Sequence, residues 1–142
     1  MGQVFHCKTV SRGVVQGEAL ISTDSVLFYC TDPTTGRVTE AGHSLEGISV
    51  KDKILIMPGG KGSSVVQADG MYRLDKHGTA PKGLIVQELD TVLVSSAVIM
   101  EMPMAYQVEE TFYRTVRNGD KIRIDTEKQT IERLHSTQEE NG

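Results

Sequence analysis

The sequence has few cysteines, no long apolar segment and no excess of positive charge, and each shortage excludes a class of protein. Cys7 and Cys30 are the only cysteines and do not form a CxxC motif, so they predict neither a disulfide framework nor a metal site made by cysteines alone. The longest apolar run, residues 92–100, is interrupted by two serines and is far shorter than the ~20 residues that cross a bilayer. The formal net charge of -4 gives no reason to expect nucleic acid or a membrane as a partner.

The N-terminal sequence, MGQVFHCKTV, has no basic region followed by an apolar block, so we expect no signal peptide. Together with the scarcity of cysteine, this favours a reducing compartment, and we expect a cytoplasmic protein. A chain of 142 residues, 38% of them hydrophobic, is long enough to bury a core. We therefore expect a single domain over residues 1–142, with a core at about 3–134 and a polar tail at 135–142.

Apolar patterns predict strands at both ends of the chain and a βαβαβ unit between them. Early strands are predicted over VFHCKTV and GEALIS, central ones over KILIM, GLIVQ and PMAYQV, and a final pair over RNGDKIRIDTEKQTIERL. Asp90 predicts the cap of a helix over TVLVSSAVIM, and EETFYRTV predicts a shorter one. This order indicates a mixed α/β architecture rather than a doubly wound sheet.

The first central helix is predicted to start at Ser64 and to end before Gly78, because a serine commonly begins a helix and a glycine follows its last turn. Apolar side chains at helical spacing are expected to form its buried face. They are Val65, Ala68, Met71, Tyr72 and Leu74.

The stretch PGGKGSS, residues 58–64, joins a predicted strand to this helix. The first N–H groups of a helix lack partners within it and carry a partial positive charge, so a carboxylate or phosphate binds well there. Lys61 would add a full charge, Ser63 and Ser64 would add hydroxyl donors, and the glycines would let the backbone approach the ligand. The alternative interpretation, which is equally well supported by this stretch alone, is that Ser63 or Ser64 only caps the helix and that the glycines only turn the chain. A nucleotide P-loop is not supported, because Gly62 separates the lysine from the serines.

Ser63 cannot become a base through the loop alone. Lowering a hydroxyl pKa to near neutrality takes several units at about 1.36 kcal/mol each. A helix N-terminus supplies about 0.3–1 kcal/mol, and up to about 2 kcal/mol when partly buried. A cation, a metal-bound substrate or further hydrogen bonds must therefore come from elsewhere.

Other candidates do not form a complete active site. His43 is either a ligand or acid or, more commonly for a lone histidine, a structural residue. Cys30 beside Asp32 is either a metal ligand or, more commonly, a small buried side chain. Glu101 follows the second helix, and no role is assigned to it.

Several segments, in their order along the chain, resemble the small subunit of the aconitase X family, the part equivalent to the swivelling domain of aconitase. They are GEALIS, TDPTTGRV, HSLEGISVKDKILIMPGGKGSS, HGTAPKGLIV, AVIMEMPM and NGDKIRID, and they span roughly residues 12–126. The resemblance implies a three-layer β/β/α swivelling domain that closes over a large subunit. It also implies that this partner holds the iron or iron–sulfur centre and most of the substrate contacts.

Members of the family are hydro-lyases. One branch dehydrates cis-3-hydroxy-L-proline to Δ1-pyrroline-2-carboxylate, and another dehydrates mevalonate 5-phosphate. By similarity to the Gly-Ser-Ser motif of aconitase, Ser63 occupies the position of the proton-abstracting serine. Lys61, Gly62 and Ser64 are implied to bind the substrate.

The chain also departs from the family pattern. Cys30-Thr31-Asp32-Pro33 replaces a common GGVDP, Lys61 replaces a common arginine, and Val65 stands where aconitase has an arginine. The phosphomevalonate branch favours Gly-Ser-Thr in the loop, so Gly62-Ser63-Ser64 favours the hydroxyproline branch. The sequence therefore predicts the small subunit of a cis-3-hydroxy-L-proline dehydratase, with mevalonate 5-phosphate as the alternative substrate. A non-catalytic module that binds small anions is the alternative of another class.

Overall fold

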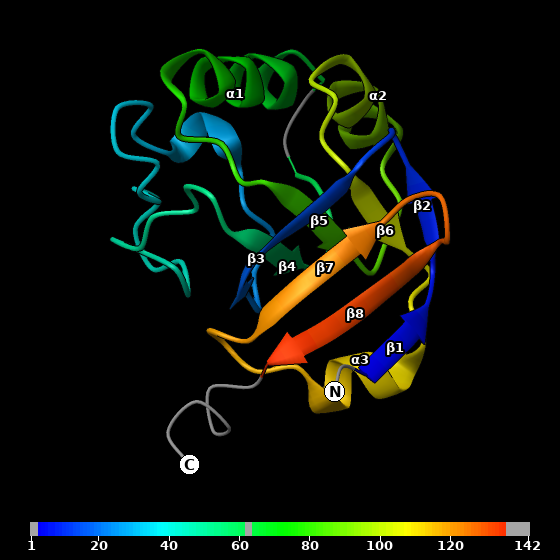
Figure 1. Cartoon of the computed structure of the whole chain (residues 1–142). Coiled ribbons are helices and arrows are strands. Elements are labelled where there is room, and N and C mark those ends of the chain that lie inside the picture. The colour runs from blue at the N-terminus through cyan, green and yellow to red at the C-terminus, as the bar shows by residue number, and fades with distance from the viewer. Residues whose placement is uncertain (1–2, 62–63, 136–142) are drawn as a thin grey trace.

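The computed structural model describes residues 3–61 and 64–135, which form eight strands and three α-helices (Figure 1). The strands are β1 (Gln3–His6), β2 (Lys8–Val10), β3 (Val14–Ile21), β4 (Ile54–Met57), β5 (Gly83–Val86), β6 (Met104–Tyr106), β7 (Lys121–Asp125) and β8 (Thr130–His135). The helices are α1 (Ser64–His77), α2 (Thr91–Ile99) and α3 (Glu110–Thr115), with a short 3-10 helix η1 (Phe28–Cys30). None of them, in the part of the chain that is described, is long and apolar enough to cross a membrane.

Strand β3 belongs to two sheets. Its first five residues pair with β7 in the antiparallel direction, and residues 19–21 pair with β4 in the parallel direction. Strands β4, β5 and β6 continue the parallel sheet, whereas β8 and β1 extend the antiparallel one, in the order β1-β8-β7-β3-β4-β5-β6-β2. The two sheets are therefore joined through β3, which pairs with a strand of each.

Alternation along the parallel strands separates two apolar clusters, because successive side chains of a strand point to opposite faces. In β4, Leu55 and Met57 face the cluster beneath α1 and α2, whereas Ile54 and Ile56 face the cluster against the second sheet. Figure 1 shows α1 and α2 together on one side and α3 beside β1 on the other. This arrangement confirms the predicted three-layer β/β/α fold.

Helix α1 has the predicted bounds, and the predicted buried face is confirmed at Met71 and Leu74 but wrong at its three other residues. Val65 and Tyr72 are 76% and 56% exposed, and Ala68 is exposed as well. The residues that face the core are Gln67, Gly70, Met71 and Leu74. This buried row includes a glutamine and a glycine, and a prediction based on the spacing of apolar residues does not identify them.

Gly70 is in this row because the backbone of η1 crosses the helix there. A methyl group at Gly70 would overlap the backbone of Phe28 and Tyr29. The crossing brings the segment between β3 and β4, residues 22–53, against the helix. This segment has little regular structure, yet its apolar side chains Val26, Phe28, Val38, Leu45 and Val50 are buried in the same cluster as Met71 and Leu74.

Replacing Gly70 with alanine therefore tests the crossing. Helix propensity alone favours alanine by about 1 kcal/mol. Overpacking against the η1 backbone should outweigh this and lower the free energy of unfolding by about 1–3 kcal/mol, measured by urea unfolding. Asp69→Ala, at the neighbouring exposed position, should stay within about 0.5 kcal/mol of the wild type. A stabilised Gly70→Ala variant would contradict the crossing.

Candidate functional site

The glycine-serine stretch follows the carboxyl end of β4 and leads into α1. Because β3, β4 and β5 are parallel, the loops that follow them meet at one edge of the sheet. Ligands of parallel α/β sheets bind at this edge. Backbone N–H groups of Gln87 and Glu88, after β5, both donate to the Pro58 carbonyl, at 3.1 and 2.8 Å. The first part of the stretch is thereby fixed to the loop that precedes α2.

Two glycines of the stretch lie close to neighbouring protein atoms. A Cβ at Gly59 would lie 3.2 Å from the Glu88 carbonyl oxygen. At Gly60 it would lie 2.5 Å from the Gln67 Oε1 and 3.2 Å from the Asp90 Oδ2. Asp90 also caps α2, as predicted, by accepting from the amides of Val92 and Leu93. A Cβ at either position would thus face the protein itself, and the close approach of a bound group to this backbone stays a prediction.

Lys61 forms an ion pair at this edge. Its Nζ lies 2.7 Å from Glu40 Oε2, and the two side chains are 38% and 30% exposed. Lys61 and Glu40 line a pocket of about 400 Å³ together with Asp24, Ser25 and His43, all from the segment that follows β3. The ammonium group that was predicted to contact the substrate is thus already paired with a carboxylate.

Asp24 places a second carboxylate beside the same pocket. A hydrogen bond from the Ser44 amide to its side chain, at 2.9 Å, lowers the pKa of Asp24, and the charge of Lys61 contributes in the same direction. The carboxylate is therefore ionised near neutral pH. Because Lys61 faces two negative groups, its attraction for a free anion is reduced.

His43 is a structural residue in this arrangement. Its ring is 7% exposed, and its Nδ1 accepts from the Leu45 amide at 2.9 Å. The proton therefore lies on Nε2, which donates to the Ser25 carbonyl at 2.9 Å. The ring joins the segment after β3 to the turn that begins at Glu40, which agrees with the structural interpretation of a lone histidine.

The predicted base lies outside the described residues. Gly62 and Ser63 are not among them, and Ser64 is described only as the first residue of α1, without its side chain. The start of α1 at Ser64 is as predicted, so the first amide groups of the helix follow directly on the glycine stretch. Of the four predicted site residues, Lys61 alone has a described side chain.

Sequence patterns missed Glu40 and Asp24. Both belong to an irregular segment without periodicity, and Glu40 reaches Lys61 across 21 positions of the chain. Gln67 was also missed, although it is 3% exposed and lies one helical turn beyond the serines. A polar residue on the core-facing row of a helix, close to its start, is a signal that sequence reading could have used.

The remaining candidates do not assemble a metal centre. Within residues 3–61 and 64–135, no group of three or more histidine, cysteine, aspartate or glutamate side chains could hold a metal ion. Cys7 and Cys30 are free, and burial raises the pKa of the Cys7 thiol to about 11.

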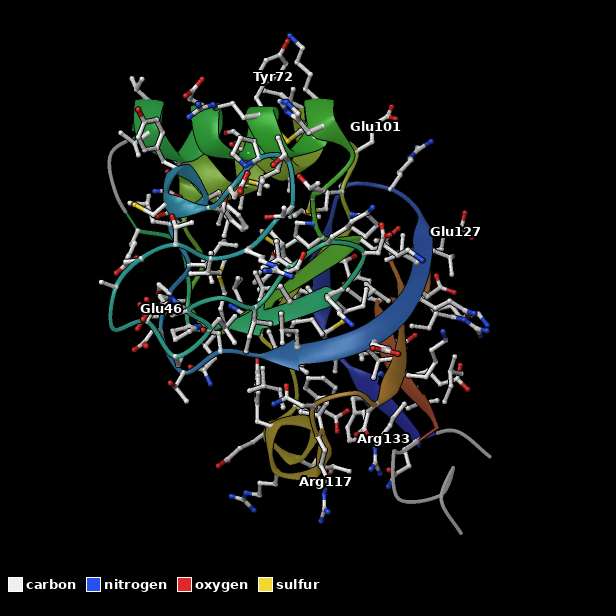
Figure 2. The ribbon with its side chains drawn as sticks, turned by 90° about the vertical axis from the view of Figure 1, so that its left-hand side faces the viewer. Glu46, Tyr72, Glu101, Arg117, Glu127 and Arg133 are labelled. Carbon is white, nitrogen blue, oxygen red and sulfur yellow. The ribbon has the colours of Figure 1, made fainter. Side chains whose placement is uncertain are left out.

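A larger hollow lies away from the glycine stretch. It measures about 600 Å³ and is lined by Ser11, Arg12, Val98 and Glu101. Ser11 precedes β3 and Glu101 precedes β6, so the hollow is at the amino-terminal edge of the parallel strands, opposite the glycine stretch. Figure 2 shows Glu101 on the other side of the molecule from Glu46, which belongs to the same turn region as Glu40. The position of the hollow at the wrong edge of the sheet favours the smaller pocket as the candidate site.

Comparison with known proteins gives a family match over most of the chain. A family model described as the aconitase X swivel domain matches residues 4–133. The chain is 40% identical over 126 residues to the phosphomevalonate dehydratase small subunit of Methanosarcina acetivorans, covering 88% of this chain and 87% of that protein. It is 39% identical over 131 residues to the protein of the same name from Methanosarcina mazei, covering 92% and 90%.

A solved structure has the same fold. The crystal structure of Thermococcus kodakaraensis aconitase X in its holo-form superposes with a TM-score of 0.84 at 33% sequence identity. The match covers 94% of this chain and 99% of that one. The three-layer architecture is therefore shared over nearly the full length of both.

The Asp24 carboxylate predicts a specific pH dependence. A depressed pKa in the folded state stabilises the protein above the ordinary value of about 3.9, and this contribution is lost as the pH falls through the folded value. We expect wild type to be more stable than Asp24→Asn at pH 6, with the difference shrinking only below about pH 4. Urea unfolding of both proteins between pH 3 and 6 measures it. A difference that grows as the pH falls would show that Ser44 does not bind the ionised form.

Proposed function

The chain belongs to the aconitase X swivel-domain family, and from this we propose that it is the small subunit of a two-subunit dehydratase that acts on a small hydroxy acid. The observation that carries the proposal is the match of residues 4–133 to the family model. Relatives named as small subunits are covered over 87% and 90% of their own lengths, which supports a role as a whole subunit.

For the substrate, we propose mevalonate 5-phosphate. Two relatives at 40% and 39% identity are both named phosphomevalonate dehydratase small subunit. The opposite expectation, cis-3-hydroxy-L-proline, depends on the tripeptide Gly62-Ser63-Ser64, whereas the identities extend over 126 and 131 residues. We therefore reverse the order of the two substrates and keep cis-3-hydroxy-L-proline as the second candidate, favoured by the tripeptide.

We propose that the two subunits supply different parts of the active site, with the metal centre in the large subunit. The iron or iron–sulfur centre expected for the family is assigned to the partner because the family implies it there; among residues 3–61 and 64–135 no group of side chains could hold a metal ion. In the family such a centre supplies Lewis acidity, which makes hydroxide a better leaving group. This chain is proposed to contribute the anion-binding start of α1, the Lys61 ammonium and the Ser63 hydroxyl.

Ser63 is proposed to take the proton from the carbon next to the one that loses hydroxide. The start of α1 favours the ionised hydroxyl by about 0.3–1 kcal/mol, which is far less than this task requires. Closure against a second subunit would exclude water and strengthen every electrostatic interaction in the site. The chain alone is therefore expected to be inactive.

Turnover by the reconstituted pair tests the function. We expect the two subunits together to dehydrate mevalonate 5-phosphate faster than cis-3-hydroxy-L-proline, and this chain alone to dehydrate neither. Ser63→Ala should lower kcat by at least about a hundredfold, which is the scale of a general base. Ser95→Ala is a matched control, because Ser95 is an exposed serine of α2 and should leave kcat unchanged.

The outcomes separate the parts of the proposal. Turnover of cis-3-hydroxy-L-proline alone would correct the substrate, and full turnover by Ser63→Ala would end the assignment of the base. If this chain binds a small anion without a partner and the pair dehydrates neither substrate, the chain is a non-catalytic binding module.

A further inference from the structure

Two ion pairs of the same kind lie at the two ends of β4. Lys53 precedes the strand and pairs with Glu18, whereas Lys61 follows it and pairs with Glu40, each with 2.7 Å between nitrogen and oxygen. The Glu40–Lys61 pair has one feature of its own, which concerns the second carboxylate oxygen of Glu40. This atom, Oε1, is buried and has no hydrogen-bond partner among the described residues.

The unpartnered oxygen makes a purely stabilising role a poor explanation of the Glu40–Lys61 pair. A half-exposed ion pair contributes about 0–1 kcal/mol. A buried acceptor without a donor costs about 1–3 kcal/mol. The expected gain in folding free energy from the Glu40–Lys61 ion pair therefore does not exceed the cost of the unpartnered oxygen.

Glu40 is held in place by its surroundings. The amide of Thr39, its neighbour, donates to the Cys30 carbonyl at 2.9 Å, and the His43 amide donates to the Glu40 carbonyl at 3.2 Å. His43 is in turn fixed by Ser25 and Leu45. A carboxylate on this rigid turn can orient a long, flexible lysine side chain.

The contact with Glu40 also weakens the attraction of the Lys61 ammonium for free anions. With Glu40 at 2.7 Å and Asp24 beside the same pocket, the side chains around the ammonium carry more negative than positive charge. Free anions are therefore attracted weakly, although the ammonium itself is well placed.

We propose that Glu40 is a positioning residue of the substrate site, which fixes the Lys61 ammonium and restrains its attraction for free anions. The inference rests on the proposed function, because it takes Lys61 as a contact of the substrate. Orientation favours turnover, whereas partial neutralisation weakens non-productive binding. Removing the charge of Glu40 should therefore change turnover and anion binding in opposite directions.

The experiment is a double-mutant cycle with Glu40→Gln and Lys61→Met. Turnover is measured on the reconstituted pair, and binding of inorganic phosphate is measured on the full chain by phosphorus NMR titration. Glu40→Gln should lower kcat/KM about tenfold or more and tighten phosphate binding about threefold or more. In the Lys61→Met background the same substitution should change neither, because residues that act as a unit are not additive.

Glu18→Gln is the matched control. It removes the carboxylate from an ion pair of equal length at the other end of β4, and it should leave turnover and phosphate binding unchanged. Urea unfolding of each variant shows that a loss of turnover is not a loss of folded protein.

Several results would overturn the proposal. One is an equal loss of turnover from Glu40→Gln with and without the Lys61→Met substitution, as a purely structural role requires. Another is phosphate binding that Glu40→Gln does not strengthen, including the case in which no variant binds phosphate. If the wild-type pair dehydrates neither substrate, the proposed function fails, and the phosphate titration still tests whether Glu40 restrains the attraction of Lys61 for free anions.

Discussion

The pairing of β3 with two strands of opposite direction is the constraint on which the architecture depends. Its first half bonds to β7 and its last three residues bond to β4, so one strand belongs to both sheets. The two sheets can then enclose the cluster that contains Ile54, Ile56 and Ile124. The same pairing aligns the ends of β3, β4 and β5, and thereby brings the glycine stretch next to the segment that follows β3.

That segment provides a rigid support although it has little regular structure. Its apolar side chains share a core with α1, and several of its polar side chains bond within the segment. His43, Asp24 and Ser44 link its beginning to the turn that carries Glu40. The Leu45 amide donates to the buried His43 ring, and breaking that bond would leave a buried polar group without a partner.

The sequence predicts the elements of this fold better than it predicts their contacts. KILIM and GLIVQ form β4 and β5, and α1 begins at Ser64, because apolar runs and capping residues are local signals. The buried face of α1 was predicted correctly at Met71 and Leu74, but Gln67 and Gly70 complete it, and Gly70 does so because the backbone of η1 crosses the helix there. The Glu40–Lys61 pair could not be predicted at all, since an irregular segment has no period from which the direction of a side chain follows. For the substrate, one tripeptide favours one branch of the family, whereas similarity along the whole chain favours the other.

The contacts of Pro58, Gly59 and Gly60 have a consequence for how such a site opens. The Pro58 carbonyl accepts from two amides of the loop before α2, and a Cβ at Gly59 or Gly60 would come close to Glu88 or Gln67. The start of the glycine stretch is therefore attached to its own domain. In a two-subunit enzyme, entry and exit of small molecules would then be controlled by rigid-body displacement between the polypeptides, and the gate would be the subunit boundary itself.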